Sequence, residues 1–357
     1  VYDGTWGKKS KSGNLIWQNV IFLRSIINNL LLFKYFFKGD IMVAPLHVQN
    51  ELKYGLEINK VYNEDCLIGM QKIKDKSIDM ILCDLPYGTT QNKWDSIIPL
   101  NDYIEIEIKN KIVCMNENEY KLYCFENNIP LEIFKIRWKE KSKKGLWTHY
   151  KRIIKDNGVI ILTSQGNFTS KLISSNEEMF KYKIIWEKSK STNFLNSKKQ
   201  PLRKHEDICV FYKKQPTYNP QMSEGEAYNK GTRKNQLTGS YGDFKPVEVK
   251  SNGERYPTDI VYFKTAESEG EVYHPTQKPV ELGKYLIKTF TNEGDVILDN
   301  TCGSGSFLVS AILEKRNFIG FEKNENVELF KKDDICYIDI CNNRIKKAFK
   351  SISVCQK

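Results

Sequence analysis

An acidic, proline-stiffened turn follows a short apolar run in the first third of the chain. The turn consists of Asp84, Leu85, Pro86 and Tyr87, and residues 80–83 before it have the length and types of a buried strand. Pro86 fixes its own φ and biases Leu85 towards extended backbone, so the carbonyl groups point in set directions. Such a turn can grip a planar, amino-bearing ring, because oxygens accept the amino hydrogens while the tyrosine stacks. A purely structural turn is the alternative.

A glycine turn joins a predicted strand to a predicted helix near the C-terminus. In VILDNTCGSGSFLVSAI, Gly303 and Gly305 allow a tight bend and the close approach of a ligand. Glu322 ends the next predicted strand, 23 residues after Asp299, a spacing at which an acid commonly accepts hydrogen bonds from ribose hydroxyls. Leu308 stands where a dinucleotide-binding turn needs a third glycine, which favours a smaller nucleoside cofactor. A glycine turn that only permits close helix packing is the alternative.

Three motifs occur in an order that resembles one enzyme family. NEDCLIGMQKIKDKSIDMILCDLPYG is followed by HPTQKPVELGKYLI and then by ILDNTCGSGSF. In that order they resemble the amino-methylating (adenine-N6 or cytosine-N4) DNA methyltransferases, and specifically the permuted beta group, whose catalytic motif precedes its cofactor motif. The resemblance covers most of residues 58–347. It implies a circularly permuted, Rossmann-like α/β fold with a seven-stranded sheet and inserted segments, S-adenosylmethionine as cofactor, and double-stranded DNA as substrate.

The resemblance also implies roles for individual residues. The catalytic Asp-Pro-Pro-Tyr motif of the family corresponds to Asp84, Leu85, Pro86 and Tyr87, with leucine in place of the first proline. The cofactor-binding residues that it implies are Asp65, Asp84, Lys278, Asp299, Thr301, Gly303, Gly305 and Glu322. Of these, Asp65 would hold the adenine amino group, Glu322 the ribose, and Lys278 the region near the cofactor's carboxylate. Thr301 stands where the family has phenylalanine, which puts that aromatic contact in question.

The expected chemistry is methyl transfer to an exocyclic amino group. The amino nitrogen is a poor nucleophile because its lone pair is delocalised into the ring. We expect Asp84 and the Leu85 carbonyl to accept both amino hydrogens, and a flipped-out base to stack on Tyr87. An aspartate at position 84 favours adenine, since serine often occupies that place in cytosine-N4 enzymes. The alternatives are cytosine-N4 methylation, a catalytically silent DNA-binding regulator of the same fold, and a nicotinamide-dependent oxidoreductase.

Composition agrees with a globular protein that binds a polyanion. The 357 residues include 55 basic and 44 acidic ones, for a net charge of +11, which favours nucleic acid as a partner. A coding bias towards Lys, Asn and Ile would also raise this charge without selection for binding. Hydrophobic residues make up 40% of the chain, which supports a packed core rather than a disordered chain. The resemblance further admits a homodimer and a cognate restriction nuclease as partners.

Cysteine usage and hydropathy bear on the cellular setting. The nine cysteines include no Cys-x-x-Cys pair and only four histidines accompany them, so we expect no metal site. A scattered, odd set suits a reducing cytoplasm, of a bacterial cell or a phage-infected host. Gln18, Arg24, Asn28 and Lys34 interrupt the apolar stretch of residues 14–37, which leaves no unbroken apolar span of about twenty residues. We therefore expect no membrane anchor.

From residue 58 onward, short strand-like runs alternate with helical stretches, the pattern of an α/β sheet. The predicted strands begin near residues 60, 79, 158, 182, 207, 295 and 318. A glycine turn and an amphipathic helix separate the last two, which predicts a βαβ unit of parallel strands. The basic, aromatic segment 188–207 is expected to track DNA phosphates at the mouth of the site, with a solvated loop as the alternative.

The predicted organisation is one methyltransferase domain, residues 42–347, with two irregular regions. Residues 101–147 are charged and aromatic and appear as an insertion between core elements, whereas residues 213–262 are rich in Gly, Asn, Tyr and Pro. The second region is the candidate for recognition of the DNA sequence. Residues 1–41 are expected to be an N-terminal extension, either an amphipathic helix or sequence outside the folded enzyme, and residues 348–357 a C-terminal tail.

Overall fold

The computed structural model describes residues 53–89, 95–233, 245–274, 276–324 and 336–354. The predicted N-terminal extension, residues 1–41, lies outside these ranges. In the ranges that are described, no helix combines the length and the apolar character that crossing a membrane requires.

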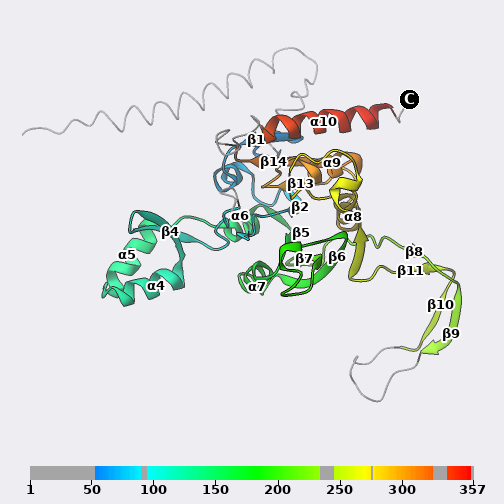
Figure 1. Ribbon diagram of the computed structural model, residues 1–357, viewed down its shortest axis with the longest axis horizontal. Helices are drawn as coiled ribbons and strands as arrows, with labels where there is room; N and C mark the ends of the chain where they lie inside the picture. The colour runs from blue at the N-terminus through cyan, green and yellow to red at the C-terminus, as the bar shows by residue number, and fades with distance from the viewer. Residues whose placement is uncertain (1–52, 90–94, 234–244, 275, 325–335, 355–357) are drawn as a thin grey trace, which may run out of the picture. The chain divides into compact units, whose positions relative to one another are not determined.

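One eight-stranded sheet organises this part of the chain (Figure 1). In sheet order its strands are β1 (Lys60–Asn63), β14 (Asn317–Glu322), β13 (Val296–Asp299), β2 (Ile78–Cys83), β5 (Ile154–Ser164), β7 (Arg203–Phe211), β6 (Phe180–Thr192) and β12 (Ile260–Phe263). The first five run parallel to one another, β7 is antiparallel to both neighbours, and β12 pairs parallel with β6. The fold is α/β and its sheet is mainly parallel, as predicted.

All seven predicted strands belong to this sheet, and β12 is an eighth that the sequence did not indicate. Its sequence, IVYF, is itself an apolar run of β-branched and aromatic residues, but it was included in the region predicted to be irregular. In the structure its side chains alternate between exposed and half-buried at the edge of the sheet. They also end the region predicted to recognise DNA, which therefore contributes its last residues to the core sheet.

Helices cover both faces of the sheet because successive side chains of a strand point to opposite sides. From β2, Ile81 and Cys83 face a core that includes α3 (Cys66–Gly69), η1 (Met70–Lys72), α6 (Leu146–Ile153) and α7 (Asn167–Ser174). Met80 and Leu82 face the other core, with α8 (Val280–Phe290), α9 (Ser306–Leu313) and α10 (Tyr337–Val354). The result is a three-layer sandwich in which α9 connects β13 to β14, the predicted βαβ unit.

The insertion has its own secondary structure and its own small core. It contains a hairpin of β3 (Tyr103–Ile108) and β4 (Lys111–Asn116) followed by α4 (Glu117–Glu126) and α5 (Leu131–Lys141). Ile104, Tyr120, Cys124 and Phe134 form the core. Asp102 links the two ends of the insertion, because its carboxylate accepts hydrogen bonds from the Gly145 amide at 3.0 Å and the Thr148 hydroxyl at 2.6 Å. Because α6 begins at Leu146 and packs on the main sheet, the insertion ends before the predicted residue 147.

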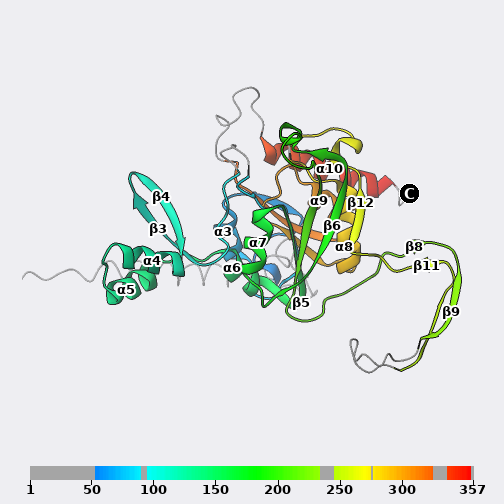
Figure 2. The same cartoon turned by 60° about the horizontal axis from the view of Figure 1, so that its bottom comes forward.

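The candidate recognition region contains two short antiparallel ribbons (Figure 2). One pairs β8 (Ser223–Glu224) with β11 (Glu254–Arg255), and the other pairs β9 (Tyr228–Arg233) with β10 (Val247–Ser251). Two further single turns, η2 (Phe194–Asn196) and η3 (Ala266–Ser268), complete the described elements. The boundary predicted at residue 347 is wrong, since α10 continues to Val354 with Ala348 buried.

The two glycines of the predicted turn have different structural roles. Gly305 precedes α9 with φ of +81°, and a Cβ there would lie 2.4 Å from the Sγ atom of Cys341 on α10. Gly303 also has a positive φ, +50°, but no atom of the described residues lies within 4 Å of where its Cβ would stand. Gly305 therefore permits close helix packing, whereas the space beside Gly303 is open.

Gly305→Ala should lower the free energy of unfolding by about 2–4 kcal/mol, because it adds overpacking to the strain of a left-handed backbone. Gly303→Ala should lose only the backbone part, about 1–2 kcal/mol. Cys341→Ala should recover part of the loss in the Gly305→Ala background and none in the Gly303→Ala background. Equilibrium urea denaturation measures all three, and equal losses for the two glycines would contradict this account.

Candidate active site

The predicted site residues meet at one edge of the sheet. Asp84 follows β2, Asp299 ends β13, Glu322 ends β14 and Asp65 follows β1, and these four strands are adjacent and parallel. Their carboxyl ends therefore open on the same crevice, where ligands bind in open α/β sheets. A cavity of about 780 Å³ lies there, lined among others by Asp65, Asp84, Leu85, Pro86, Tyr87, Lys278, Asp299, Thr301, Gly303 and Glu322. Of the predicted residues only Gly305 does not line it.

Four side chains, one of them within the turn itself, contact Asp84 and hold it in place. The Asp84 Oδ1 atom accepts hydrogen bonds from the Tyr87 hydroxyl at 2.8 Å and the Thr163 hydroxyl at 2.5 Å. Its Oδ2 atom lies 2.7 Å from the Lys278 Nζ atom. The Thr301 hydroxyl donates to the Asp84 backbone carbonyl at 3.1 Å, which ties the glycine turn directly to the acidic turn. The carboxylate is therefore fixed through both oxygens before any substrate is present.

The other residues of the acidic turn are anchored by apolar contacts. Leu85 is 3% exposed and belongs to the hydrophobic core, so leucine replaces the family's proline without an exposed apolar group. The Tyr87 ring stacks on Phe168 with centroids 5.3 Å apart. Burial raises the pKa of the Tyr87 hydroxyl well above its usual value, and the nearby Asp84 and Glu206 carboxylates add to the rise. Tyr87 therefore stays neutral and donates to Asp84.

Three further charged side chains, those of Lys278, Glu206 and Lys188, form successive ion pairs beyond Asp84. Glu206 lies 3.3 Å from Lys278 and 3.1 Å from Lys188, measured between the charged atoms. The side chains of Lys188, Lys278 and Glu206 are only 5%, 6% and 11% exposed. Charges this deeply buried remain ionised only when they are paired.

The pKa values of Glu206 and Lys278 shift in the directions that their ion pairs favour. Burial acts to raise the pKa of Glu206, but Lys278 and Lys188 outweigh it, so the pKa lies below its usual value. Burial likewise acts to lower the pKa of Lys278, and the Asp84 and Glu206 carboxylates outweigh it, so the pKa is raised. Both residues therefore carry their charges at neutral pH.

One expectation about a lysine needs correction. Lys188 does not face phosphates from segment 188–207, because its ammonium is buried against Glu206. Lys278 lines the cavity with its ammonium between Asp84 and Glu206, and its place near the cofactor's carboxylate stays a prediction. Sequence reasoning missed Thr163 and the pairing of Glu206 with Lys188, since each is a polar residue within a strand and only the folded sheet shows its partner.

The side of the cavity next to the glycine turn is built from backbone amides and acids. The Glu322 Oε2 atom accepts a hydrogen bond from the Gly303 amide at 2.7 Å, and burial still raises the pKa of this carboxyl. Asp299 accepts from the Thr301 amide at 3.2 Å, and burial raises its pKa well above the usual value. Asp65 caps α3 by accepting from the Leu67 amide at 2.9 Å.

These residues fit the nucleoside cofactor that the sequence implies. The space beside Gly303 is open at the cavity wall, where a ligand can approach the backbone closely. Glu322 can accept hydroxyl groups at the end of the strand that follows the glycine turn. The insertion adds Tyr103 and Cys114 to the lining, a contribution that the sequence did not indicate.

Comparison with known proteins places the chain in a family. The model of the N6/N4 family, described as DNA methylase, matches residues 78–332, which is well over half of the chain. The chain belongs to this DNA methylase family. It is a site-specific DNA amino-methyltransferase that uses S-adenosylmethionine, as the three ordered motifs predicted.

The curated relatives match at low identity over most of their length. Type II methyltransferase M.HindIII of Haemophilus influenzae is 24% identical over 307 residues, which cover 76% of this chain and 93% of the relative. Type II methyltransferase M2.MboI of Moraxella bovis is 28% identical, covering 76% and 86%. DNA adenine methyltransferase YhdJ of Escherichia coli is 25% identical, covering 76% and 81%. Among solved structures, the M1.HpyAVI–SAM complex aligns with a TM-score of 0.46 at 17% identity, over 80% of this chain and 98% of the other.

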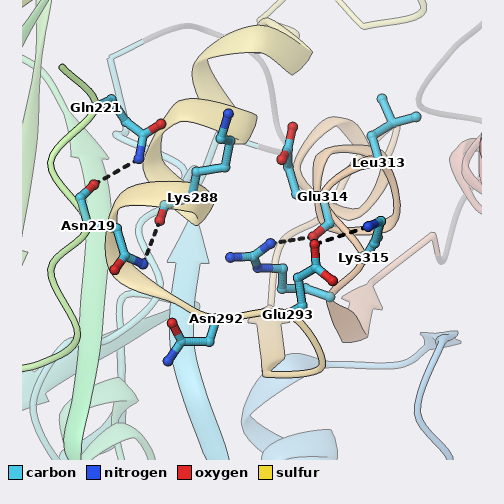
Figure 3. Close-up of a pocket in the computed structure, with 9 residues that line it drawn as sticks. Asn219, Gln221, Lys288, Asn292, Glu293, Leu313, Glu314 and Lys315 are labelled. Atoms are coloured by element: carbon cyan, nitrogen blue, oxygen red, sulfur yellow. Dashed lines mark hydrogen bonds and ion pairs between the residues drawn. The ribbon is translucent and has the colours of Figure 1, made fainter.

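A second, smaller cavity of about 530 Å³ lies near the start of β13 and β14, away from their carboxyl ends (Figure 3). It is polar, and its side chains mostly bond to one another or to nearby carbonyls: Lys315 pairs with Glu293 at 3.1 Å, and Asn219 donates to the Lys288 carbonyl at 3.1 Å. No predicted site residue lines it. Within the described ranges, no group of three or more His, Cys, Asp or Glu side chains is arranged to hold a metal ion.

Lys278→Met should lower the free energy of unfolding by about 3–5 kcal/mol at neutral pH, because it leaves two carboxylates without their shared cation. The difference from the unmodified protein should shrink as the pH falls, since protonation removes the uncompensated charges. Urea denaturation at several pH values measures this difference. Lys204→Met, which removes an exposed pair with Glu187, is the control. A loss that is independent of pH would contradict the buried pairing.

Proposed function

We propose that this enzyme transfers the methyl group of S-adenosylmethionine to N6 of adenine in double-stranded DNA. The observation that carries the proposal is a half-buried aspartate, Asp84, fixed in the same cavity as the open glycine turn and Glu322. An aspartate at this place favours adenine over cytosine. The similarity to a relative named as a DNA adenine methyltransferase supports the same choice.

The geometry leaves room for the amino group of the base at Asp84. Each carboxylate oxygen can accept about two hydrogen bonds. Oδ1 already accepts from Tyr87 and Thr163, whereas Oδ2 accepts from Lys278 and keeps capacity for one amino hydrogen. The Leu85 carbonyl, in the same turn, accepts the other hydrogen. Holding both hydrogens localises the lone pair on nitrogen.

Transfer then depends on charge and alignment. Bound S-adenosylmethionine supplies a methyl group on a positively charged sulfur. The amino nitrogen becomes positive as it takes the methyl group, and the Asp84 carboxylate stabilises that charge. The Asp84 carboxylate can also accept the proton that the nitrogen then sheds. Alignment of nitrogen and methyl group within one cavity supplies much of the rate.

Access to the cavity requires the base to leave the duplex, because its amino group cannot be reached inside the stack. Tyr87 is the platform on which we place the flipped base. Its ring is held by Phe168 and its hydroxyl by Asp84, so the platform is rigid before the base arrives.

We assign recognition of the DNA sequence to residues 213–259, ahead of the edge strand β12. Their ribbons place two basic side chains near one aromatic ring: Arg255 lies 4.6 Å and Lys230 5.1 Å from the centroid of Tyr228. Such groups suit phosphate and base contacts.

Asp84→Ala should bind S-adenosylmethionine about as well as the unmodified enzyme and lose methyl transfer by about 10²–10³-fold or more, because one preorganised charged group is removed. The assay uses duplex DNA and isotope-labelled methyl donor, followed by mass spectrometry of the nucleosides. Asp156→Ala, at an exposed ion pair with Lys76, is the control. Near-normal transfer in the Asp84 variant would defeat the assignment, and N4-methylcytosine as product would replace adenine by cytosine as the substrate.

Cofactor affinity should fall as the pH drops through the raised pKa of Glu322, because only the carboxylate accepts ribose hydroxyls fully. Binding should then release a proton, which calorimetry in buffers of different ionisation enthalpy detects. Glu322→Gln should weaken affinity about tenfold at neutral pH, as expected for a lost charged hydrogen bond. It should also flatten the pH dependence. The same pH dependence in both proteins would remove Glu322 from the ribose site.

A further inference from the structure

Four buried or half-buried charges of alternating sign form a row that ends at the catalytic carboxylate. In order they are Lys188, Glu206, Lys278 and Asp84, joined by contacts of 3.1, 3.3 and 2.7 Å. The pairing of β6 with β7 brings the first two together, because Glu206 lies opposite Trp186 and Lys188 is the next residue on the same face. Lys278 enters from the loop before α8.

The row is neutral only when Glu206 is present. Two ammonium groups balance two carboxylates, so removing Glu206 leaves a net positive charge beside Asp84. Lys278 would then have Asp84 as its one carboxylate partner in the row. This matters for the reaction, because the amino nitrogen gains positive charge next to Asp84 as the methyl group arrives.

We propose that Glu206 is a positioning residue for methyl transfer, which shares Lys278 with Asp84 and so preserves the negative charge that the amino group needs. The proposal rests on the proposed function of Asp84. Glu206 acts through Lys278, and to a lesser extent through the Tyr87 hydroxyl, which lies 3.4 Å from its Oε2 atom. Glu206 lines the cavity, but the role proposed for it needs no contact with the base.

A structural role for Glu206 would have a different signature. If Glu206 only satisfied two buried lysines, its loss would lower stability and leave the turnover of folded enzyme unchanged. If it acts through charge, its loss lowers kcat, and restoring neutrality by a second substitution recovers kcat. The kinetics of folded enzyme therefore separate the two roles.

The test compares Glu206→Gln, Glu206→Asp and the double variant Glu206→Gln/Lys188→Met. We expect Glu206→Gln to lower kcat about 10- to 100-fold, the loss typical of a hydrogen bond to a charged group. KM for S-adenosylmethionine should stay within about threefold, because Glu206 does not act on the cofactor. Glu206→Asp should recover part of the loss because it keeps the charge. The kcat of the double variant should exceed that of Glu206→Gln severalfold, because the row is neutral again.

The controls keep each outcome interpretable. Glu187→Gln, on the neighbouring strand in an exposed pair with Lys204, should behave like the unmodified enzyme. Single-turnover rates are normalised to the enzyme that binds S-adenosylmethionine, so unfolded protein does not count. If Glu206→Gln does not fold, the double variant carries the test, and a loss as large as that of Asp84→Ala would overturn the proposal.

Two results separate this inference from the proposed function. Unchanged kcat in Glu206→Gln, or a double variant no faster than the single one, overturns the role of Glu206 while methyl transfer by the unmodified enzyme still stands. Absence of transfer by the unmodified enzyme overturns the proposed function and this inference with it.

Discussion

The parallel pairing of β2 with β13 is the constraint on which the active site depends. Ile81 lies beside Leu298 in this pairing, so the turn at Asp84 and the turn at Gly303, far apart in the chain, begin at the same edge of the sheet. The Thr301 hydroxyl then joins the two turns at the Asp84 carbonyl. A shift of this pairing by one residue would turn the buried side chains of one strand to the opposite face and separate the two turns.

Ion pairs between buried side chains hold the charged groups of the site in place. Burying Asp84 near other acids is unfavourable unless cations accompany it, and the fold supplies Lys278 from a distant loop. Lys278 in turn requires a second carboxylate, which β7 supplies as Glu206. Asp84 is thus one member of a set of four paired charges of alternating sign.

Much of the fold followed from the sequence because buried strands and the glycine turn leave local signals. The apolar runs predicted seven strands, and the order of three motifs predicted the family. The edge strand β12 was missed although its residues, IVYF, carry a strand signal, because they were included in the region predicted to be irregular. The helix α10 was not predicted, and the tail expected from residue 348 begins within it. Glu206 and Lys188 were missed because their importance arises only when β6 and β7 pair. The contact for which Gly305 makes room, with Cys341, was not foreseen because no local pattern reveals which helix packs there.

The central claim is that the acidic turn and the glycine turn flank one methyl donor. The most direct measurement is a crystal structure of this protein with a non-reactive analogue of S-adenosylmethionine. The account predicts the analogue in the cavity at the carboxyl ends of β2, β13 and β14, with its ribose hydroxyls on Glu322 and its sulfur-equivalent atom facing the turn at Asp84. An analogue bound elsewhere, or bound in this cavity with its ribose away from Glu322 and its transferable end away from Asp84, would contradict the account.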